Sequence, residues 1–225
     1  MDVRQCLFEK QDLAYQAFQK RIIPHEERII GVRMKDVRMI AKQCFKEEGL
    51  AYLERELDYH EEKLIRGMVL ARIEDMEQML LWIPSQLSLI DNWALCDQFV
   101  SELKITKSDP ERMLHFMRLY YQSKETYALR FLCVMFLTYY VQDTYRKEAF
   151  ACFEAMHSED YYVKMALAWA VSIYYFDDRK ETIRFLEKHS LDAWTHNKAI
   201  QKICESLRIE AEEKAYVQAL KRPCA

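Results

Sequence analysis

A tryptophan and an aspartate four residues apart form the pair in this chain whose types could do chemistry together. Trp93 and Asp97 would lie one above the other on a helix, because positions i and i+4 share a face. Asp91 or Asn92 would cap the start of that helix. Two interpretations are open. Trp93 could anchor the core beside an acid on the solvated edge, or the pair could form the floor of a site that handles a cation.

Other chemistry is sparse. The sequence contains no phosphate-binding glycine motif, no helical zinc motif and no nucleophile elbow. The histidines are too dispersed to nominate as metal ligands, and we expect packing or surface roles for His115, His157, His189 and His196. We therefore predict neither a metal nor a cofactor. Arg130 and Trp169 remain, with Trp93 and Asp97, as the constellation whose residue types converge on one chemistry.

Composition predicts the kind of fold that must position these residues. The chain has 225 residues, of which 51% are hydrophobic, with only three glycines and four prolines. So few helix breakers favour a nearly all-α chain over a turn-rich β-architecture. The net charge of −3 argues against a uniformly basic nucleic-acid binder but leaves room for a local basic face.

Cellular location is also indicated by the sequence. Seven dispersed cysteines without a paired motif are typical of reduced thiols in a cytoplasmic protein. No apolar signal region follows the N-terminal methionine, and the longest uncharged apolar stretches are too short to span a bilayer. We expect a cytoplasmic protein that acts away from membranes.

Apolar periodicity predicts helices along most of the chain. An interrupted helical rhythm covers residues 2–20, Pro24 marks a break, and residues 29–33 form a connector before a helix at 35–47. Pro84 and Pro110 are expected at breaks or first helical turns. The helices that follow come in antiparallel pairs: 50–57 with 61–73, 75–82 with 91–103, 110–121 with 125–141, 145–156 with 160–175, and 179–188 with 194–207.

A repeat of 34 residues relates three of the second helices. Segments 127–132, 161–166 and 195–200 align, each with a basic residue in its fourth place. The signature of tetratricopeptide repeats is missing, so HEAT-like helix pairs fit better. Such pairs stack into an α-solenoid superhelix whose second helices form a concave surface. We predict one domain over residues 1–225, with an N-terminal helical cap (1–48), stacked pairs (50–208) and a C-terminal tail or helix (209–225).

Basic residues in repeat register would line that concave surface. Arg130, Lys164 and Lys198 occupy equivalent positions, and Arg66 lies on the matching helix of an earlier pair. A second basic concentration runs from residue 20 to residue 42. Each residue alone would be an ordinary solvated cation. Together they predict a concave basic groove.

Several segments, taken in this order, resemble one family of repair proteins. They are Ile29-Ile-Gly-Val-Arg33, Asn92-Trp-x-x-Cys-Asp97, the Arg130 helix, Tyr162-Val-Lys-Met-Ala-Leu-Ala-Trp169, and Asn197-Lys-Ala-Ile-Gln-Lys202 with Ser206. On these residues, which span most of the chain, the sequence resembles the AlkD-like DNA alkylation repair proteins. These are DNA glycosylases built of HEAT-like repeats. Asn92 departs from some members, which carry a second tryptophan there.

The resemblance implies an activity and a site. The family excises cationic N3- and N7-alkylated purines from duplex DNA without drawing the base into a pocket. By resemblance the catalytic residues are Asp97, Trp93, Trp169 and Arg130. Asp97 would stabilise the cationic sugar and orient a water, the tryptophans would hold the deoxyribose, and Arg130 would grip a phosphate. The cations expected to bind DNA are Arg33, Lys35, Arg38, Arg66, Lys164, Lys198 and Lys202.

Three functions remain distinct at this point. The first is a monofunctional alkylpurine DNA glycosylase that works as a monomer, without metal or cofactor, on duplex DNA containing alkylated bases. The second is a non-catalytic repeat protein that binds damaged or branched DNA. The third is a protein-interaction scaffold. The catalytic interpretation requires that Asp97 open onto a groove, so an Asp97 buried in the core would exclude it.

Overall fold

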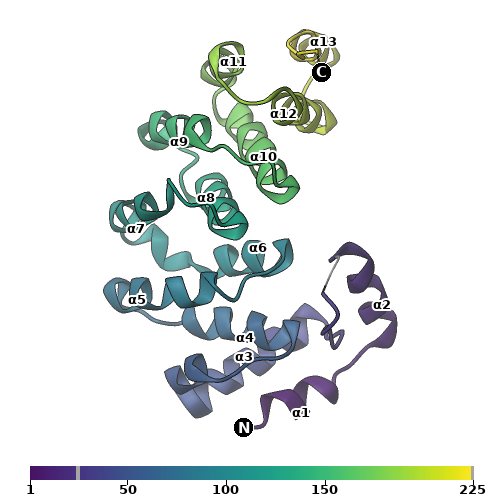
Figure 1. Ribbon diagram of the computed structural model, residues 1–225, viewed down its shortest axis with the longest axis vertical. Helices are drawn as coiled ribbons and strands as arrows, with labels where there is room; N and C mark the ends of the chain where they lie inside the picture. Colours follow the sequence, from purple (N-terminus) through teal and green to yellow (C-terminus); the bar gives the residue numbers. More distant parts are fainter. Residues whose placement is uncertain (24–25, 224–225) are drawn as a thin grey trace. The chain divides into compact units, whose positions relative to one another are not determined.

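The computed structural model describes residues 1–23 and 26–223, and within these ranges the chain is all-α (Figure 1). The break predicted at Pro24 and the thiol of Cys224 lie outside the described residues. The chain divides into two compact units, Met1–Met113 and Leu114–Ala225, with the boundary inside α7 (Pro110–Met117). The predicted all-helical fold is confirmed.

The first unit begins with two short helices in place of one interrupted helix. Besides α7, its helices are α1 (Val3–Phe8), α2 (Leu13–Ile22), α3 (Met34–Glu48), α4 (His60–Leu70), α5 (Met76–Leu87) and α6 (Trp93–Glu102). α4 packs against α3 and α6. Short 3₁₀ helices, η1 (Gly49–Glu54) and η2 (Lys104–Lys107), follow α3 and α6.

Two elements of the first unit differ from the prediction. The segment 50–57 is the 3₁₀ helix η1, and α5 continues through Pro84 to Leu87. Proline removes one backbone donor from a helix, but Ile83 and Leu87 on either side are buried, so packing keeps the chain helical. The Ser85 hydroxyl also donates to the carbonyl of Trp82 at 2.8 Å, which satisfies a backbone acceptor near the proline.

The helices of the second unit follow the predicted ranges closely. The elements of this unit are η3 (Arg118–Tyr120), α8 (Thr126–Tyr139), α9 (Asp143–Ala155), α10 (Tyr161–Asp177), α11 (Arg179–Lys188), α12 (Ala193–Glu205) and α13 (Ala211–Ala219). α10 packs between α8 and α12, so the second helices of successive pairs lie side by side (Figure 1). Aromatic side chains such as Phe136, Phe153 and Tyr174 fill the space between them and are completely buried.

Side-chain caps explain why several helices start where they do. Asp160 accepts a hydrogen bond from the amide of Tyr162 at the start of α10, and Asp192 accepts one from Thr195 in α12. At α6 the cap is Asn92, whose side chain accepts from the amide of Leu95 at 3.1 Å. The cap places Trp93 as the first residue of the helix.

Candidate functional site

Trp93 and Asp97 line a cavity of about 330 Å³ in the first unit. Both side chains are partly exposed, whereas Leu95, on the opposite side of α6, is only 2% exposed. α2 contributes Tyr15, Gln19 and Ile22 to the cavity wall, and α4 contributes His60 and Leu64. Asp97 is therefore not a core residue, and the geometric condition that would have excluded the catalytic interpretation is not met.

The indole of Trp93 is held in place by a hydrogen bond. Its Nε1–H donates to the carbonyl oxygen of Ile22 at 2.9 Å, near the last turn of α2. A helix C-terminus has free carbonyl groups, so this bond satisfies one of them and fixes the ring at the same time. The position of α2 therefore determines where the aromatic face of Trp93 lies in the cavity.

Gln19 and His60 are cavity residues that the sequence interpretation missed. Gln19 is only 5% exposed, and its Oε1 has no hydrogen-bond partner in the part of the chain that the structure describes. His60 is 1% exposed, and burial lowers its pKa to about 4, so the ring is neutral at physiological pH. Gln19 shares a helix face with Tyr15. A polar residue on the inward face of α2 was therefore the sequence signal that could have identified Gln19 as a cavity residue.

Gly31 and Glu61 hold α2 against the cavity. The buried carboxylate of Glu61 accepts hydrogen bonds from the backbone amides of Ile30, Gly31 and Val32 at 2.9, 2.7 and 3.2 Å. Gly31 has a φ of +92°, and a Cβ atom there would lie 2.5 Å from the Cβ of Gln16 in α2. A side chain at this position is thus excluded both by the backbone conformation and by the close approach of α2.

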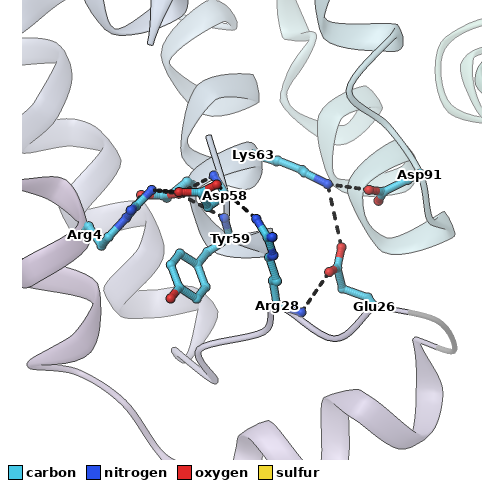
Figure 2. A network of polar contacts seen from close by, with 8 residues as sticks. Arg4, Glu26, Arg28, Asp58, Tyr59, Lys63 and Asp91 are labelled. Carbon is cyan, nitrogen blue, oxygen red and sulfur yellow. Dashed lines mark hydrogen bonds and ion pairs between the residues drawn. The ribbon is translucent and has the colours of Figure 1, made fainter. Parts of the chain in front are cut away.

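Charged residues tie the same connector to α4 and to the start of α6 (Figure 2). Lys63 in α4 forms ion pairs with Asp91, just before α6, and with Glu26, at 3.8 Å. Arg28 and Arg4 both reach Asp58, at 3.0 and 2.6 Å. Exposed pairs of this kind contribute little stability one by one, but a network restricts the elements that it joins. It orients the segments that carry Trp93 and Gln19.

The cations predicted to bind DNA in the N-terminal region are exposed. The side chain of Arg33 is 58% exposed, lies over the ring of Tyr15 and pairs with Asp12 at 2.8 Å. Arg38 pairs with Glu102 at 3.2 Å. Lys35 is exposed on the first turn of α3. All three can exchange solvent or an acid for a phosphate oxygen.

Arg66 lies in the interior instead. It is 3% exposed, and its guanidinium donates to the carbonyl of Leu53 at 3.0 Å, to Gln86 Oε1 at 2.7 Å and to Ser85 Oγ at 2.8 Å. These bonds connect α4 to η1 and α5, which is a structural task. We therefore leave Arg66 out of the DNA-binding residues proposed below.

In the second unit, Arg130 and Trp169 have contrasting surroundings. Arg130 is 6% exposed, and one of its guanidinium nitrogens donates to the carbonyl of Tyr162 at 2.9 Å. This bond links α8 to the first turn of α10. Trp169, in the middle of α10, is partly exposed.

The predicted basic stripe of the second unit is unevenly neutralised. Lys164 pairs with Glu159 at 2.7 Å and lies 3.6 Å from Asp192, and the bond to Glu159 is the main cause of its raised pKa. Partial burial lowers the pKa of Lys202, and the charges of Lys198 and Arg130 lower it further, against the effect of Glu205. The charges of Lys198 and Arg130 thus lie near enough to Lys202 to repel its ammonium group, and an anion would relieve that repulsion.

The described residues contain no group of three or more His, Cys, Asp or Glu side chains that could hold a metal ion. No helix within residues 1–23 and 26–223 is long and apolar enough to cross a membrane.

These features first define a class: an all-α protein of consecutive helix pairs, with an aspartate and a tryptophan in a cavity of one unit and a cluster of cations in the other. The family model described as DNA alkylation repair enzyme matches residues 3–203. The chain belongs to this family, as its motifs predicted, and its role is in the repair of alkylated DNA. A search of curated proteins finds no match.

Proposed function

We propose that this protein is a DNA glycosylase that hydrolyses the N-glycosidic bond of cationic N3- and N7-alkylated purines in duplex DNA, without flipping the base. The observation that carries the proposal is the partly exposed Asp97 beside Trp93 in the cavity of the first unit. A carboxylate next to an aromatic face suits a site where positive charge develops.

The chemistry asks little of the protein beyond electrostatics. An alkylated purine already carries a positive charge, so it leaves as a neutral base once the bond between C1′ and nitrogen breaks. The sugar then acquires oxocarbenium character, which the Asp97 carboxylate stabilises. Water adds to C1′ with Asp97 orienting it, and its proton passes to the carboxylate or to solvent. Such a reaction requires no metal and no cofactor.

Trp93 and Gln19 fit supporting roles in the same cavity. The hydrogen bond from Trp93 Nε1 to Ile22 leaves the face of the indole for the deoxyribose. On binding, the Gln19 side chain would turn so that its Oε1, which is buried and without a partner in the described residues, accepts from a donor on the nucleic acid. We further propose that Trp169 contacts the sugar of the same DNA.

Binding of the duplex is assigned to the remaining cations. Arg33, Lys35 and Arg38 would bind phosphates from the first unit, and Arg130, Lys198 and Lys202 from the second, with Lys164 contributing if it leaves its acidic partners. Contacts to phosphate position the protein without reading sequence. Affinity should therefore fall steeply as salt concentration rises.

The decisive experiment is the release of 7-methylguanine from methylated duplex DNA by Asp97→Asn, measured by chromatography of free bases in single turnover. Loss of a fixed charge at the developing cation should slow release about 100-fold or more. Glu111→Gln is the matched control, because it makes the same change from carboxylate to amide at an exposed position of α7 outside the cavity. Unchanged release by Asp97→Asn would refute the mechanism.

A second function, DNA binding without excision, is favoured by one observation. Arg130 is 6% exposed and donates to Tyr162, so the cation assigned to phosphate contact is mostly enclosed by protein. In this case the wild-type protein would bind methylated and unmethylated duplex equally, in a salt-sensitive manner. It would release no base even when the protein is in large excess over DNA.

A further inference from the structure

α2 lies at one edge of the first unit (Figure 1), and its outward face carries an exposed phenylalanine. Phe18 is 43% exposed. It lies about one helical turn from Tyr15 and from Ile22, which both line the cavity, but it does not line the cavity itself. Its exposed neighbours Ala14 and Ala17 are small and do not cover its ring. Phe18 is therefore an unburied apolar side chain at the rim of the cavity.

The ring of Phe18 is ordered by its neighbours. It stacks on the ring of Tyr15, with centroids 6.1 Å apart and planes 22° from parallel. The guanidinium of Arg21 lies over the Phe18 ring, 5.8 Å from its centroid. Arg21 is itself exposed, so it can turn to a phosphate and leave the ring to a base. An exposed ring that is already ordered loses little conformational entropy when it binds a partner.

The charge of α2 favours a polyanion as the occupant of this face. The helix has Lys20 and Arg21 in its last turn and no acidic residue. Both cations are exposed, and neither has an acidic partner within residues 1–23 and 26–223. Asp12, the cap of α2, is paired with Arg33 at 2.8 Å, and Glu26 belongs to the ion-pair network of Figure 2. Apolar and cationic side chains on one helix suit the stacked bases and the phosphates of a nucleic acid.

The proposed reaction gives this face a task. Asp97 and Trp93 must reach the C1′ atom of a nucleotide whose base is paired and stacked inside a duplex. A duplex opens to a protein when an apolar side chain wedges between two base steps, which unstacks them and bends the helix axis. Damage weakens a base pair, so this unstacking costs less at the lesion than elsewhere. A wedge at the rim of the cavity acts at the place where the sugar enters.

We propose that Phe18 inserts as a wedge between the alkylated base and its neighbour in the duplex, while Arg21 turns to the adjoining phosphate. The wedge tilts the sugar of the lesion toward Asp97 and Trp93, and the base stays outside any protein pocket. This inference rests on the proposed function, because it takes an alkylated duplex as the occupant of the face. It makes Phe18 a specificity-determining residue, since weakened base pairs admit the wedge and intact pairs resist it.

The test follows the stacking of the duplex and does not require excision. The full-length protein is titrated into a duplex that contains 2′-fluoro-2′-deoxy-7-methylguanosine, with 2-aminopurine as the next base in the same strand. The 2′-fluorine destabilises the cationic sugar, so the lesion stays in place. 2-Aminopurine brightens when it loses its stacking, and fluorescence anisotropy of an end label gives the affinity.

Three variants separate a wedge from other roles. Phe18→Ala removes the apolar side chain, whereas Phe18→Leu keeps an apolar wedge without the aromatic ring. Leu13→Ala is the matched control, because Leu13 is an apolar residue of the same helix that is 68% exposed. It lies about 140° round the helix from Phe18 and therefore points away from the rim of the cavity.

The wild type and Leu13→Ala should both brighten the probe severalfold at saturation. Phe18→Ala should lose most of this rise and bind the lesion duplex about tenfold more weakly, the effect of losing one stacked ring. Its affinity for unmodified duplex should change less than about twofold, and Phe18→Leu should keep at least about half of the rise. The proposal fails if the wild type does not brighten the probe or if Phe18→Ala brightens it fully. Equal losses in Phe18→Ala and Phe18→Leu would make Phe18 a support for Tyr15 and overturn it too.

Two outcomes distinguish this inference from its alternatives. If Asp97→Asn released 7-methylguanine normally while the Phe18 variants behaved as expected on the fluorinated duplex, the catalytic mechanism would fail and the wedge would stand. Flotation with vesicles of phosphatidylserine and phosphatidylcholine tests the other polyanionic surface. Vesicle binding that depends on Phe18, together with an unchanged response of the DNA probe, would identify a membrane contact and refute the wedge.

Discussion

Two histidines with the same burial show how differently the two units treat polar side chains. His60 in the first unit and His196 in the second are each 1% exposed. His196 has partners at both ring nitrogens, at 2.7 Å to His189 and at 2.8 Å to the carbonyl of Leu220. Within the described residues the His60 ring has a single hydrogen-bond partner, Asn92, at the longer distance of 3.4 Å.

The hydrogen bonds around His196 have only one consistent direction. The carbonyl of Leu220 can only accept, so His196 Nε2 carries the hydrogen. The amide of Leu191 donates to His189 Nδ1 at 2.8 Å, so His189 Nε2–H donates to His196 Nδ1. Arg222 completes this C-terminal latch by donating to the carbonyls of Leu191 and His189, both at 3.2 Å. Every ring nitrogen is used, with both rings neutral.

In the cavity of the first unit, by comparison, buried polar groups are not fully hydrogen-bonded. Gln19 Oε1 has no partner within the described residues, and the contact of His60 with Asn92 is long. Buried polar groups with all their hydrogen bonds made help to specify a fold. Those at a cavity wall that lack a partner can instead bond to a ligand or to water. The contrast assigns the latch to structure and the cavity to binding.

Replacing each histidine by phenylalanine tests this comparison with the largest expected effect, a difference in the loss of unfolding free energy. His196→Phe leaves the Leu220 carbonyl and His189 Nε2–H buried without partners, and should cost about 3 kcal/mol of unfolding free energy. His60→Phe loses only one long contact and should cost about 1 kcal/mol or less. Urea unfolding at pH 7.5 measures both. Equal losses would remove the distinction between latch and cavity.

Acidification should sharpen the same comparison. Burial, with the charge of Arg222 as a further cause, lowers the pKa of His189 to about 3, and burial also lowers that of His196. Because an unfolded histidine titrates near 6.5, the latch stabilises the fold fully above that pH and loses its contribution as pH falls toward 3. For His189 the loss is about 1.4 kcal/mol per pH unit, and His196 adds to it in the same direction.

The control for this titration is a variant without the two rings. In His189→Phe/His196→Phe the unfolding free energy between pH 6.5 and pH 5 should decline less steeply than in the wild type, since His60 and the other histidines remain in both proteins. Parallel declines would mean that the latch histidines do not govern the acid response.

Local sequence patterns predicted the features that depend on neighbouring residues. The helix start at Trp93 followed from a capping side chain, which the structure shows to be Asn92, and the shared face of Trp93 and Asp97 followed from helical periodicity. The burial of Arg66 could not be predicted this way, because its partners come from η1 and α5, up to 20 residues away. The repeat pattern alone does not distinguish a cation that bonds to distant acceptors from a cation that faces DNA.

The cavity wall was beyond prediction for a related reason. α2 lies more than 70 residues before α6 in the sequence, and the bond from Trp93 to Ile22 joins positions 71 residues apart. α2 is also docked by Gly31, whose requirement for φ near +92° depends on where Gln16 passes. The one local sign of Gln19 is that it shares a face of α2 with Tyr15, and an ordinary solvated glutamine can occupy such a position too.

Two buried glutamines of the first unit differ in their hydrogen bonding, and replacing them should give the smallest differences in unfolding free energy. Gln86 is 1% exposed, and its Oε1 accepts from Arg66 at 2.7 Å, whereas Gln19 Oε1 has no partner within the described residues. Gln86→Leu should cost about 1 kcal/mol of unfolding free energy, because Arg66 loses an acceptor. Gln19→Leu should leave stability unchanged or slightly raised, since it removes an unsatisfied polar atom.

Affinity for DNA should respond in the opposite sense. Loss of the Gln19 acceptor should weaken binding of methylated duplex about fivefold, the value of one hydrogen bond, while Gln86→Leu should leave affinity unaltered at a temperature where it is folded. Anisotropy titrations at one fixed salt concentration measure both variants. If Gln19→Leu destabilised the fold and bound DNA normally, its unsatisfied oxygen would be a structural feature and the cavity would lose its strongest mark as a binding site.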